Sequence, residues 1–310
     1  SESPSIRLGT RGSRLARWQA NWVAGQLRAS GVDVQLVTIQ TTGDVRSGPI
    51  GSLATQGVFT KEIQRALLAS EVDLAVHSLK DLPTESVADL KLAAVPPRAA
   101  AGDAWLDGHG RPFDELPAGA RVGTGSLRRR AQVLHARPHL ELIDVRGNLE
   151  TRIAKLEAGQ FDALILAEAG LQRLELTDHI TEVFDKHVML PAVGQGALGL
   201  EIRDGDSATE TLVQRLNDLA SLQAVVAERA LLATLRGGCL APVGAWARFV
   251  GNELQLDAVV LSPDGKQRLH AQSAAAGEHA RQLGIGVAED LLEKGAADLI
   301  ALSRGTDSRD

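Results

Sequence analysis

The sequence predicts an α/β protein built from two similar α/β units, followed by a smaller α+β unit. Through residues 6–167, short apolar β-branched runs alternate with amphipathic stretches, which is typical of helices packed on a sheet. The pattern restarts after Pro96-Pro97, and from Leu219 it changes to one long helix followed by consecutive strands. A chain of 310 residues, 44% hydrophobic and 23% charged, is long enough for two or three cores.

The expected elements follow from apolar periodicity and from turn residues between the periodic segments. The first unit has strands over 6–10, 32–40 and 72–76, the last ending at His77, and helices over 15–29 and 60–70. The second has strands over 121–123, 140–145 and 163–167, with helices starting at 126 and spanning 148–158. The third has a helix over 219–235, strands over 245–250, 253–261 and 267–274, and a helix over 278–293.

The segment 190–200 is rich in glycine, which permits bends and close backbone approach, so we expect a return crossing between the first two units. The predicted domains are therefore residues 1–97 with 197–217, residues 98–196, and residues 218–310.

Residues 46–57 carry several Gly and Ser residues and are expected to be mobile.

Cys239 is the only cysteine, and it follows Gly237-Gly238 after the long helix. One cysteine excludes an internal disulfide. The thiol could be a small buried hydrophobe, a nucleophile that needs a partner His, or a point of covalent attachment. Arg236 stands nearby and no His does, which favours attachment.

Charge and hydropathy exclude several classes of protein. The formal net charge of −6 argues against a general nucleic-acid binder. No apolar run approaches the roughly 20 residues of a membrane span, and residues 1–5 do not resemble a signal peptide, so we expect a cytoplasmic protein. The basic residues are 26 Arg and 7 Lys, and many arginines fall at junctions where ligands usually bind.

A strand that ends in His77 and Ser78 carries Lys80 and Asp81 just beyond its carboxyl end. Open α/β folds bind ligands at that edge of the sheet. Asp81 could move a proton or stabilise positive charge, and Lys80 could hold an acid group. The alternative is an ordinary surface ion pair beside a turn proline.

A second cluster follows the strand at 121–123, where Ser126 is the expected helix N-cap. A helix N-terminus favours anions, so Arg128, Arg129 and Arg130 in the first turn indicate an anionic partner. Arg146 and Arg152 follow the same logic, because the arginine fork suits carboxylates. Solvated surface charge is the alternative for any single arginine.

Other kinds of site find little support. The eight His are scattered without metal-ligand spacing, and no nucleophile elbow or Walker loop is present. The glycines at 194, 196 and 199 match a dinucleotide fingerprint in spacing, but they run into a strand instead of a helix.

Several motifs together resemble the porphobilinogen deaminase family, also called hydroxymethylbilane synthases. They occur in the family's order and cover nearly the whole chain. They are residues 6–16 (IRLGTRGSRLA), 41–44 (TTGD), 59–62 (FTKE), 76–83 (VHSLKDLP), 123–129 (GTGSLRR), 146–148 (RGN), 192–197 (AVGQGA), and 227–229 (AER) with Gly237-Gly238-Cys239.

The resemblance implies a transferase of three domains, the first two similar to periplasmic binding proteins. Such an enzyme joins four porphobilinogen molecules on a dipyrromethane cofactor, releases ammonia, and gives hydroxymethylbilane for tetrapyrrole biosynthesis. It implies that a thioether holds this cofactor on Cys239 and that Asp81 is catalytic. It also implies a cytoplasmic monomer that binds porphobilinogen and needs no metal, nucleic acid or membrane.

The family's contacts carry over to matching positions of this sequence. Implied cofactor contacts are Lys80, Ser78, Arg128, Arg129, Ser126 and Asp44. Implied substrate contacts are Arg11, Ser13, Arg146, Arg152, Arg173, Gln195 and Phe59.

The sequence departs from the family pattern at Gly125, at Thr55-Gln56-Gly57 and at Arg236, which affects binding detail. A different class stays open: a non-catalytic protein of two hinged lobes that closes on a carboxylate ligand. Such a protein would need neither a lone Cys on a separate domain nor Asp81.

Overall fold

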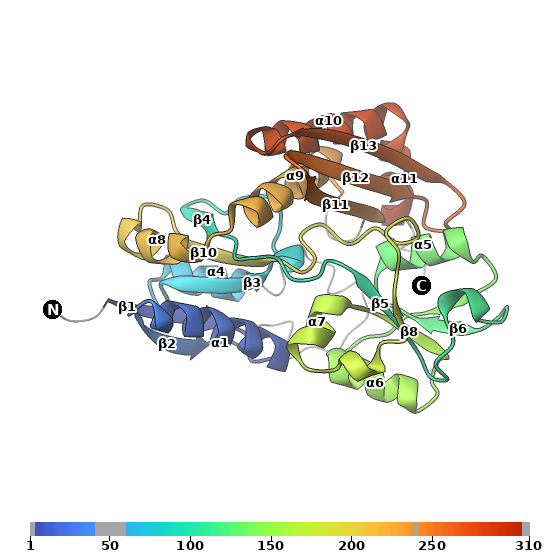
Figure 1. The fold of residues 1–310 in the computed structure, drawn as a ribbon, viewed down its shortest axis with the longest axis horizontal. Helices are drawn as coiled ribbons and strands as arrows, with labels where there is room; N and C mark the ends of the chain where they lie inside the picture. The colour runs from blue at the N-terminus through green and yellow to red at the C-terminus, as the bar shows by residue number, and fades with distance from the viewer. Residues whose placement is uncertain (1–3, 41–59, 238–240, 306–310) are drawn as a thin grey trace.

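The computed structural model describes residues 4–40, 60–237 and 241–305. Its strands form three sheets. Two five-stranded sheets lie side by side, and a three-stranded sheet lies across one side of both (Figure 1).

The first sheet has the strand order β2-β1-β3-β10-β4. Its strands are β1 (Ser5–Thr10), β2 (Asp33–Thr38), β3 (Leu74–Ser78), β4 (Leu90–Ala94) and β10 (Leu198–Arg203). Strands β1, β2 and β3 are parallel, whereas β10 runs antiparallel to β3 and β4. The helices of this part are α1 (Arg14–Ala29), α4 (Lys61–Leu68) and α8 (Ser207–Val213).

The second sheet repeats this design with the order β7-β6-β8-β5-β9. Its strands are β5 (Asp103–Asp107), β6 (Arg121–Gly123), β7 (Glu141–Ile143), β8 (Ala163–Ala167) and β9 (Glu182–Val183). Three parallel strands are again followed by an antiparallel one, here β5 beside β8. The helices are α5 (Leu127–Ala136), α6 (Leu149–Glu157) and α7 (Glu168–Arg173).

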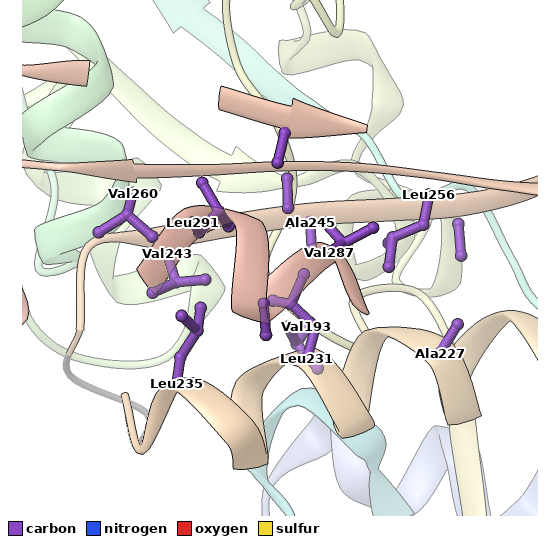
Figure 2. Packing of buried hydrophobic residues seen from close by; sticks show 14 of the residues in the cluster. Val193, Ala227, Leu231, Leu235, Val243, Ala245, Leu256, Val260, Val287 and Leu291 are labelled. Carbon is purple, nitrogen blue, oxygen red and sulfur yellow. The ribbon is translucent and has the colours of Figure 1, made fainter. Parts of the chain in front are cut away.

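The third sheet is an antiparallel meander of β11 (Val243–Val250), β12 (Glu253–Leu261) and β13 (Arg268–Ala276). Helices α9 (Leu219–Leu235) and α10 (Ala280–Glu293) pack beside it, and α11 (Ala296–Gly305) ends the described chain. Leu231 and Leu235 of α9 meet Val243 of β11 and Leu291 of α10 in one apolar core (Figure 2). Val193, from the return crossing, joins the same core.

Short 3-10 turns connect several of these elements. They span Leu79–Asp81, Phe113–Glu115, Thr177–His179, Gln214–Leu216 and Gly277–His279.

The structure confirms the predicted fold class, with two α/β parts of similar design and a smaller α+β part. The predicted strands over 121–123 and 163–167 match β6 and β8 in full. The sequence analysis missed β4, β5 and β9, and the helices α7, α8 and α11. The end of the predicted return crossing is β10, which completes the first sheet after the chain has formed the second.

One buried carboxylate joins the three sheets. Glu228 of α9 has no exposed surface, and it accepts hydrogen bonds from Arg98 Nη1 at 2.7 Å and Nη2 at 3.1 Å. It also accepts from the backbone N–H groups of Gly194, at 2.7 Å, and Ala247, at 2.8 Å. Arg98 lies on the outward crossing between the first two sheets, Gly194 on the return crossing, and Ala247 on β11, so Glu228 ties all three parts together.

Among the residues that the structure describes, no helix is both long and apolar enough to cross a membrane.

The core of the third part gives a direct stability test. Leu231→Ala removes a side chain with no exposed surface, so we expect it to lower the free energy of unfolding by about 2–5 kcal/mol. Leu219→Ala is the matched control on the same helix, because Leu219 is 62% exposed, and we expect a change within about 0.5 kcal/mol. Urea unfolding followed by circular dichroism measures both, and equal losses would contradict the packing described here.

Candidate active site

Two adjoining cavities lie at the end of β3, the first lined by the first α/β part alone and the second by residues of both α/β parts. The first cavity, of about 450 Å³, and the second, of about 500 Å³, share Leu15, Gln19 and Ser78 as walls. The first is lined by Arg11, Ser13, Leu15, Ala16, Gln19, Thr60, Ile63, Val76, His77, Ser78 and Asp81. The second is lined by Leu15, Gln19, Ser78, Lys80, Arg129, Leu149, Arg152, Leu166, Ala167, Ala169, Gly170, Arg173, Gly194, Gly196 and Ala197.

The polar residues that follow β3 line different cavities. After Ser78 the chain leaves the sheet in a 3-10 turn, fixed by the buried Leu79, whose N–H donates to Ala197 O at 3.0 Å. This turn places Lys80 on the second cavity and Asp81 on the first. The two residues therefore lie at the junction of the cavities, at the sheet edge where the sequence places them.

The return crossing packs directly on this turn. Gly194 has a φ of +72°, and a β-carbon there would lie 3.1 Å from the backbone carbon of Leu79 and 3.2 Å from the nitrogen of Lys80. Only glycine fits both the conformation and the close approach. The glycine-rich segment that the sequence marks as a crossing thus holds the Lys80 turn in place.

Lys80 is a half-buried cation that no hydrogen bond compensates. Among the described residues it makes no hydrogen bond or ion pair. Desolvation lowers its pKa to about 8; the Asp81 carboxylate opposes this shift, and Arg129 adds to it. A carboxylate ligand in the second cavity would supply the missing partner.

The N-terminus of α1 contributes Arg11 and Ser13 to the first cavity. Ser13 Oγ accepts a hydrogen bond from Ala16 N at 3.3 Å, so it caps the helix as well as lining the cavity. Gln19, one turn further, is only 3% exposed and donates from Nε2 to Ser78 Oγ at 2.8 Å. Sequence reasoning missed Gln19, although a polar residue on the buried face of an amphipathic helix is a usable signal.

Arg128 and Arg129 have an anionic partner within the protein. Asp103, fully buried on β5, accepts from Arg128 Nη1 at 2.8 Å and Nη2 at 3.1 Å, and from Arg129 Nε at 2.8 Å. Burial alone would raise the pKa of Asp103, but the two guanidinium groups hold it well below its usual range. The anion that the sequence demands at the first turn of α5 is therefore supplied, at least in part, by Asp103.

The two arginines differ in what they can reach. Arg129 lines the second cavity, whereas Arg128 lines neither and also donates to Leu190 O at 2.6 Å. Ser126 caps α5 by accepting from Arg129 N at 3.4 Å and lines neither cavity. Arg128 is thus buried off both cavities, and Ser126 caps the helix that carries Arg129.

Gln195 also lies behind the wall. Its side chain is 1% exposed, and Nε2 donates to Ala101 O at 2.8 Å, Gly102 O at 3.0 Å and Asp103 Oδ1 at 3.1 Å. It joins the return crossing to β5.

Arg152 and Arg173 reach the second cavity from the second sheet's helices. Arg152 Nε donates to Gly147 O at 2.7 Å, and Arg173 Nη2 donates to Gly196 O at 2.8 Å. Desolvation lowers the pKa of each to about 10, and for Arg152 the neighbouring Arg129 charge adds to the shift. Arg146 instead pairs with Asp144 at 3.0 Å and lines neither cavity.

Three predicted site residues, Asp44, Phe59 and Cys239, lie outside the described residues, as do residues 46–57. Within the described ranges, no cluster of three or more His, Cys, Asp or Glu side chains could hold a metal ion.

The family model described as "Porphobilinogen deaminase, dipyromethane cofactor binding domain" matches residues 6–211, and "Porphobilinogen deaminase, C-terminal domain" matches residues 222–293. The chain belongs to the porphobilinogen deaminase family. The matching porphobilinogen deaminases include one from Rubrobacter xylanophilus, 49% identical over 300 residues, covering 96% of this chain and 97% of that protein. Another, from Syntrophotalea carbinolica, is 45% identical over 302 residues and covers 96% of each chain.

Solved structures show only a distant likeness. One is a putative periplasmic sulfonate-binding protein, SsuA, from Methylobacillus flagellatus. It is 13% identical, with a TM-score of 0.38, and the match covers 76% of this chain and 69% of that one. The fold description therefore rests on the strand orders given above.

The second cavity fits a cofactor of this family. Dipyrromethane combines flat apolar rings with acetate and propionate groups, and this cavity combines Leu15, Leu149 and Leu166 with the cations Lys80, Arg129, Arg152 and Arg173. Lys80 in particular is half-buried and forms no ion pair or hydrogen bond among the described residues. The donor set suits several carboxylates better than a neutral ligand.

Removing the Asp103 carboxylate would leave two buried cations facing each other. We expect Asp103→Asn to lower the free energy of unfolding by about 3–5 kcal/mol at pH 7. Because the folded-state pKa of Asp103 is depressed, this contribution is present above about pH 4 and is lost as pH falls through the folded-state value. Urea unfolding at several pH values measures it. Asp178→Asn, at an exposed position, is the control, and a similar small effect of both variants would contradict this account.

The lowered pKa of Lys80 can be measured by competitive amine labelling and mass spectrometry across a pH series. In protein without a bound anion, we expect the labelling midpoint of Lys80 near pH 8. In Asp81→Asn the midpoint should move lower, because the Asp81 carboxylate is the main charge that raises this pKa. A wild-type midpoint at the ordinary lysine value would show that Lys80 is not desolvated.

Proposed function

We propose that this chain is a hydroxymethylbilane synthase that joins four porphobilinogen molecules head to tail on a dipyrromethane primer, releasing ammonia at each step. Family membership supports the reaction type. The observation within the structure that carries the proposal is the pairing of a carboxylate with a cation-lined cavity, because Asp81 and Lys80 open onto adjoining cavities from one turn.

Asp81 is the proposed catalytic residue. Loss of ammonia from the aminomethyl group leaves a positively charged pyrrole unit, and a fixed carboxylate stabilises charge that develops beside it. The 3-10 turn and the return crossing fix its backbone, which lowers the reorganisation that the reaction requires. A second contact strengthens this: Arg229 of α9 donates to Leu82 O at 2.9 Å and Pro83 O at 2.6 Å, just after Asp81.

The cations are proposed to hold the acetate and propionate groups of cofactor and substrate. Lys80, Arg129, Arg152 and Arg173 line the second cavity, and Arg11 with Ser13 lines the first. We propose that Ser78 contacts the cofactor between them, and that Arg128, Ser126 and Gln195 act by holding Arg129 and the crossing in position. Arg146 lies off both cavities, so we propose a role for it with a longer pyrrole chain.

Cys239 is the proposed attachment point for dipyrromethane. The helix that precedes it, α9, touches the Asp81 turn through Arg229, and Arg229 is about 9 Å along the helix axis from Leu235. After α9 the chain turns at Arg236, whose φ of 50° is left-handed, and Gly237 N–H donates to Leu232 O at 3.4 Å. The described chain thus turns sharply at the end of α9, two residues before the proposed attachment point. Asp44 and Phe59 are proposed as further contacts on sequence grounds.

The predicted domain boundaries are retained as proposals: residues 1–97 with 197–217, residues 98–196, and residues 218–310. A monomeric state, a cytoplasmic location and the lack of a nucleic-acid or membrane partner also remain predictions.

Intact-mass measurement and turnover test the proposed function together. Purified wild-type protein should carry the added mass of two linked pyrrole units, and Cys239→Ser should lack it. Asp81→Asn should keep the added mass but lose about 100-fold or more in the rate of porphobilinogen consumption. A folded wild-type chain that carries no added mass and consumes no porphobilinogen would instead support the non-catalytic carboxylate-binding protein.

A further inference from the structure

The first sheet contains a buried polar cluster that the proposed function does not use. His77 on β3, Glu201 on β10 and Gln64 on α4 are 4%, 5% and 7% exposed. His77 Nε2 lies 2.9 Å from Glu201 Oε2, and Gln64 Nε2 donates to the two oxygens of the same carboxylate at 3.0 and 3.3 Å. A buried carboxylate is costly unless its partners compensate it, so this cluster needs a physical reason.

Its hydrogen bonds fix the orientation of the imidazole ring. A carboxylate accepts, so Nε2 of His77 carries the donated proton and Nδ1 is left with a lone pair when the ring is neutral. In the part of the chain that the structure describes, Glu201 forms no ion pair with Lys or Arg. His77 is therefore the basic side chain that this carboxylate contacts among the described residues, and a positive charge on the ring would lie against the negative charge of Glu201.

His77 lies at the wall of the first cavity, and its second ring nitrogen is not used by Glu201. His77 is one of the residues that line this cavity. Within the described ranges, Nδ1 of His77 has no hydrogen-bond partner. This atom also keeps some contact with solvent. The charged groups that share the cavity are Arg11, after β1, and Asp81, after β3. His77 thus presents a base with a fixed tautomer beside the proposed catalytic carboxylate.

We propose that His77 accepts the proton released each time two pyrroles are joined. This inference rests on the proposed function. When the new carbon–carbon bond has formed, the C–H bond at the linked α-carbon of the attacking pyrrole breaks, and its electron pair returns to the ring. The proton goes to Nδ1 of His77, Glu201 stabilises the imidazolium, and the proton then passes to the ammonia released in the same cycle.

If His77 accepts the proton, Asp81 needs only to stabilise the positive charge of the pyrrole intermediates. A proton taken by the Asp81 carboxylate would remove the negative charge that supports the next cationic pyrrole. His77 avoids this conflict because its positive charge is matched by Glu201, which lies behind the cavity wall. The arrangement follows the common pairing of a His base with a carboxylate that orients it.

Two substitutions separate proton transfer from packing. His77→Gln keeps an N–H that can donate to Glu201 but has no basic nitrogen. Glu201→Gln keeps the size and one acceptor oxygen but removes the charge that stabilises the imidazolium. His135→Gln is the matched control, because His135 Nδ1 contacts Gly265 O at 2.9 Å, between α5 and the β12–β13 turn, and lines neither cavity.

The experiment is single turnover with unlabelled porphobilinogen, using enzyme whose cofactor was assembled from porphobilinogen carrying hydrogen or deuterium at its free α-carbon and was checked by intact mass. That carbon of the outer cofactor ring forms the new bond and loses its proton in this turnover. In His77→Gln we expect the bond-forming rate constant to fall about 100-fold or more, with little change in the substrate concentration needed for half-saturation. The deuterium isotope effect should rise above the wild-type value, because loss of the α-proton becomes rate-limiting. His135→Gln should match the wild type in both.

A wild-type rate and isotope effect in loaded His77→Gln would overturn the inference while leaving the proposed function intact. If His77→Gln does not fold or load its cofactor, Glu201→Gln carries the test by the same criteria. Failure of the wild-type enzyme to consume porphobilinogen would instead refute the proposed function.

Discussion

The buried carboxylate of Glu228 is the constraint on which the arrangement of the whole molecule depends. It holds the outward crossing through Arg98, the return crossing through Gly194, and the third sheet through Ala247. A buried ion pair of this kind is not an efficient source of stability, because desolvation offsets much of the attraction. Its main effect is to fix the relative positions of three chain segments, because all three can donate hydrogen bonds to this carboxylate in only one arrangement.

A second buried carboxylate, Asp103, balances the charge of two buried arginines, whereas Glu228 fixes the positions of chain segments. Without it, Arg128 and Arg129 would add two uncompensated cations to a region that already contains Lys80. With it, Arg128 and Arg129 share one carboxylate, while Lys80, Arg152 and Arg173 on the wall of the second cavity form no ion pair with it. This explains how a chain with a net charge of −6 can present a cationic cavity.

The sequence was sufficient to predict the fold class, most of the long elements and the turn that carries Lys80 and Asp81, because these depend on local periodicity. The partner of the α5 arginines was not predictable, since Asp103 precedes Arg128 by 25 residues and comes next to it only when β5 pairs with β8. The same holds for His77 and Glu201, which are 124 residues apart. Short strands such as β9 also carry too little periodic signal to be recognised.

The two crossings between the first and second sheets touch backbone to backbone. Ala99 N–H donates to Gly196 O at 3.2 Å, and a β-carbon on Gly196 would lie 2.6 Å from Ala99 O and 2.7 Å from Ala100 O. Two chain segments in such close contact form a pair, here called the ribbon, that cannot slide past each other without losing the contact. The two lobes could therefore move apart or together while this ribbon stays intact, and such a motion would change the width of the second cavity. Lys80 and Arg173 both contact the ribbon, so their positions relative to each other would change little.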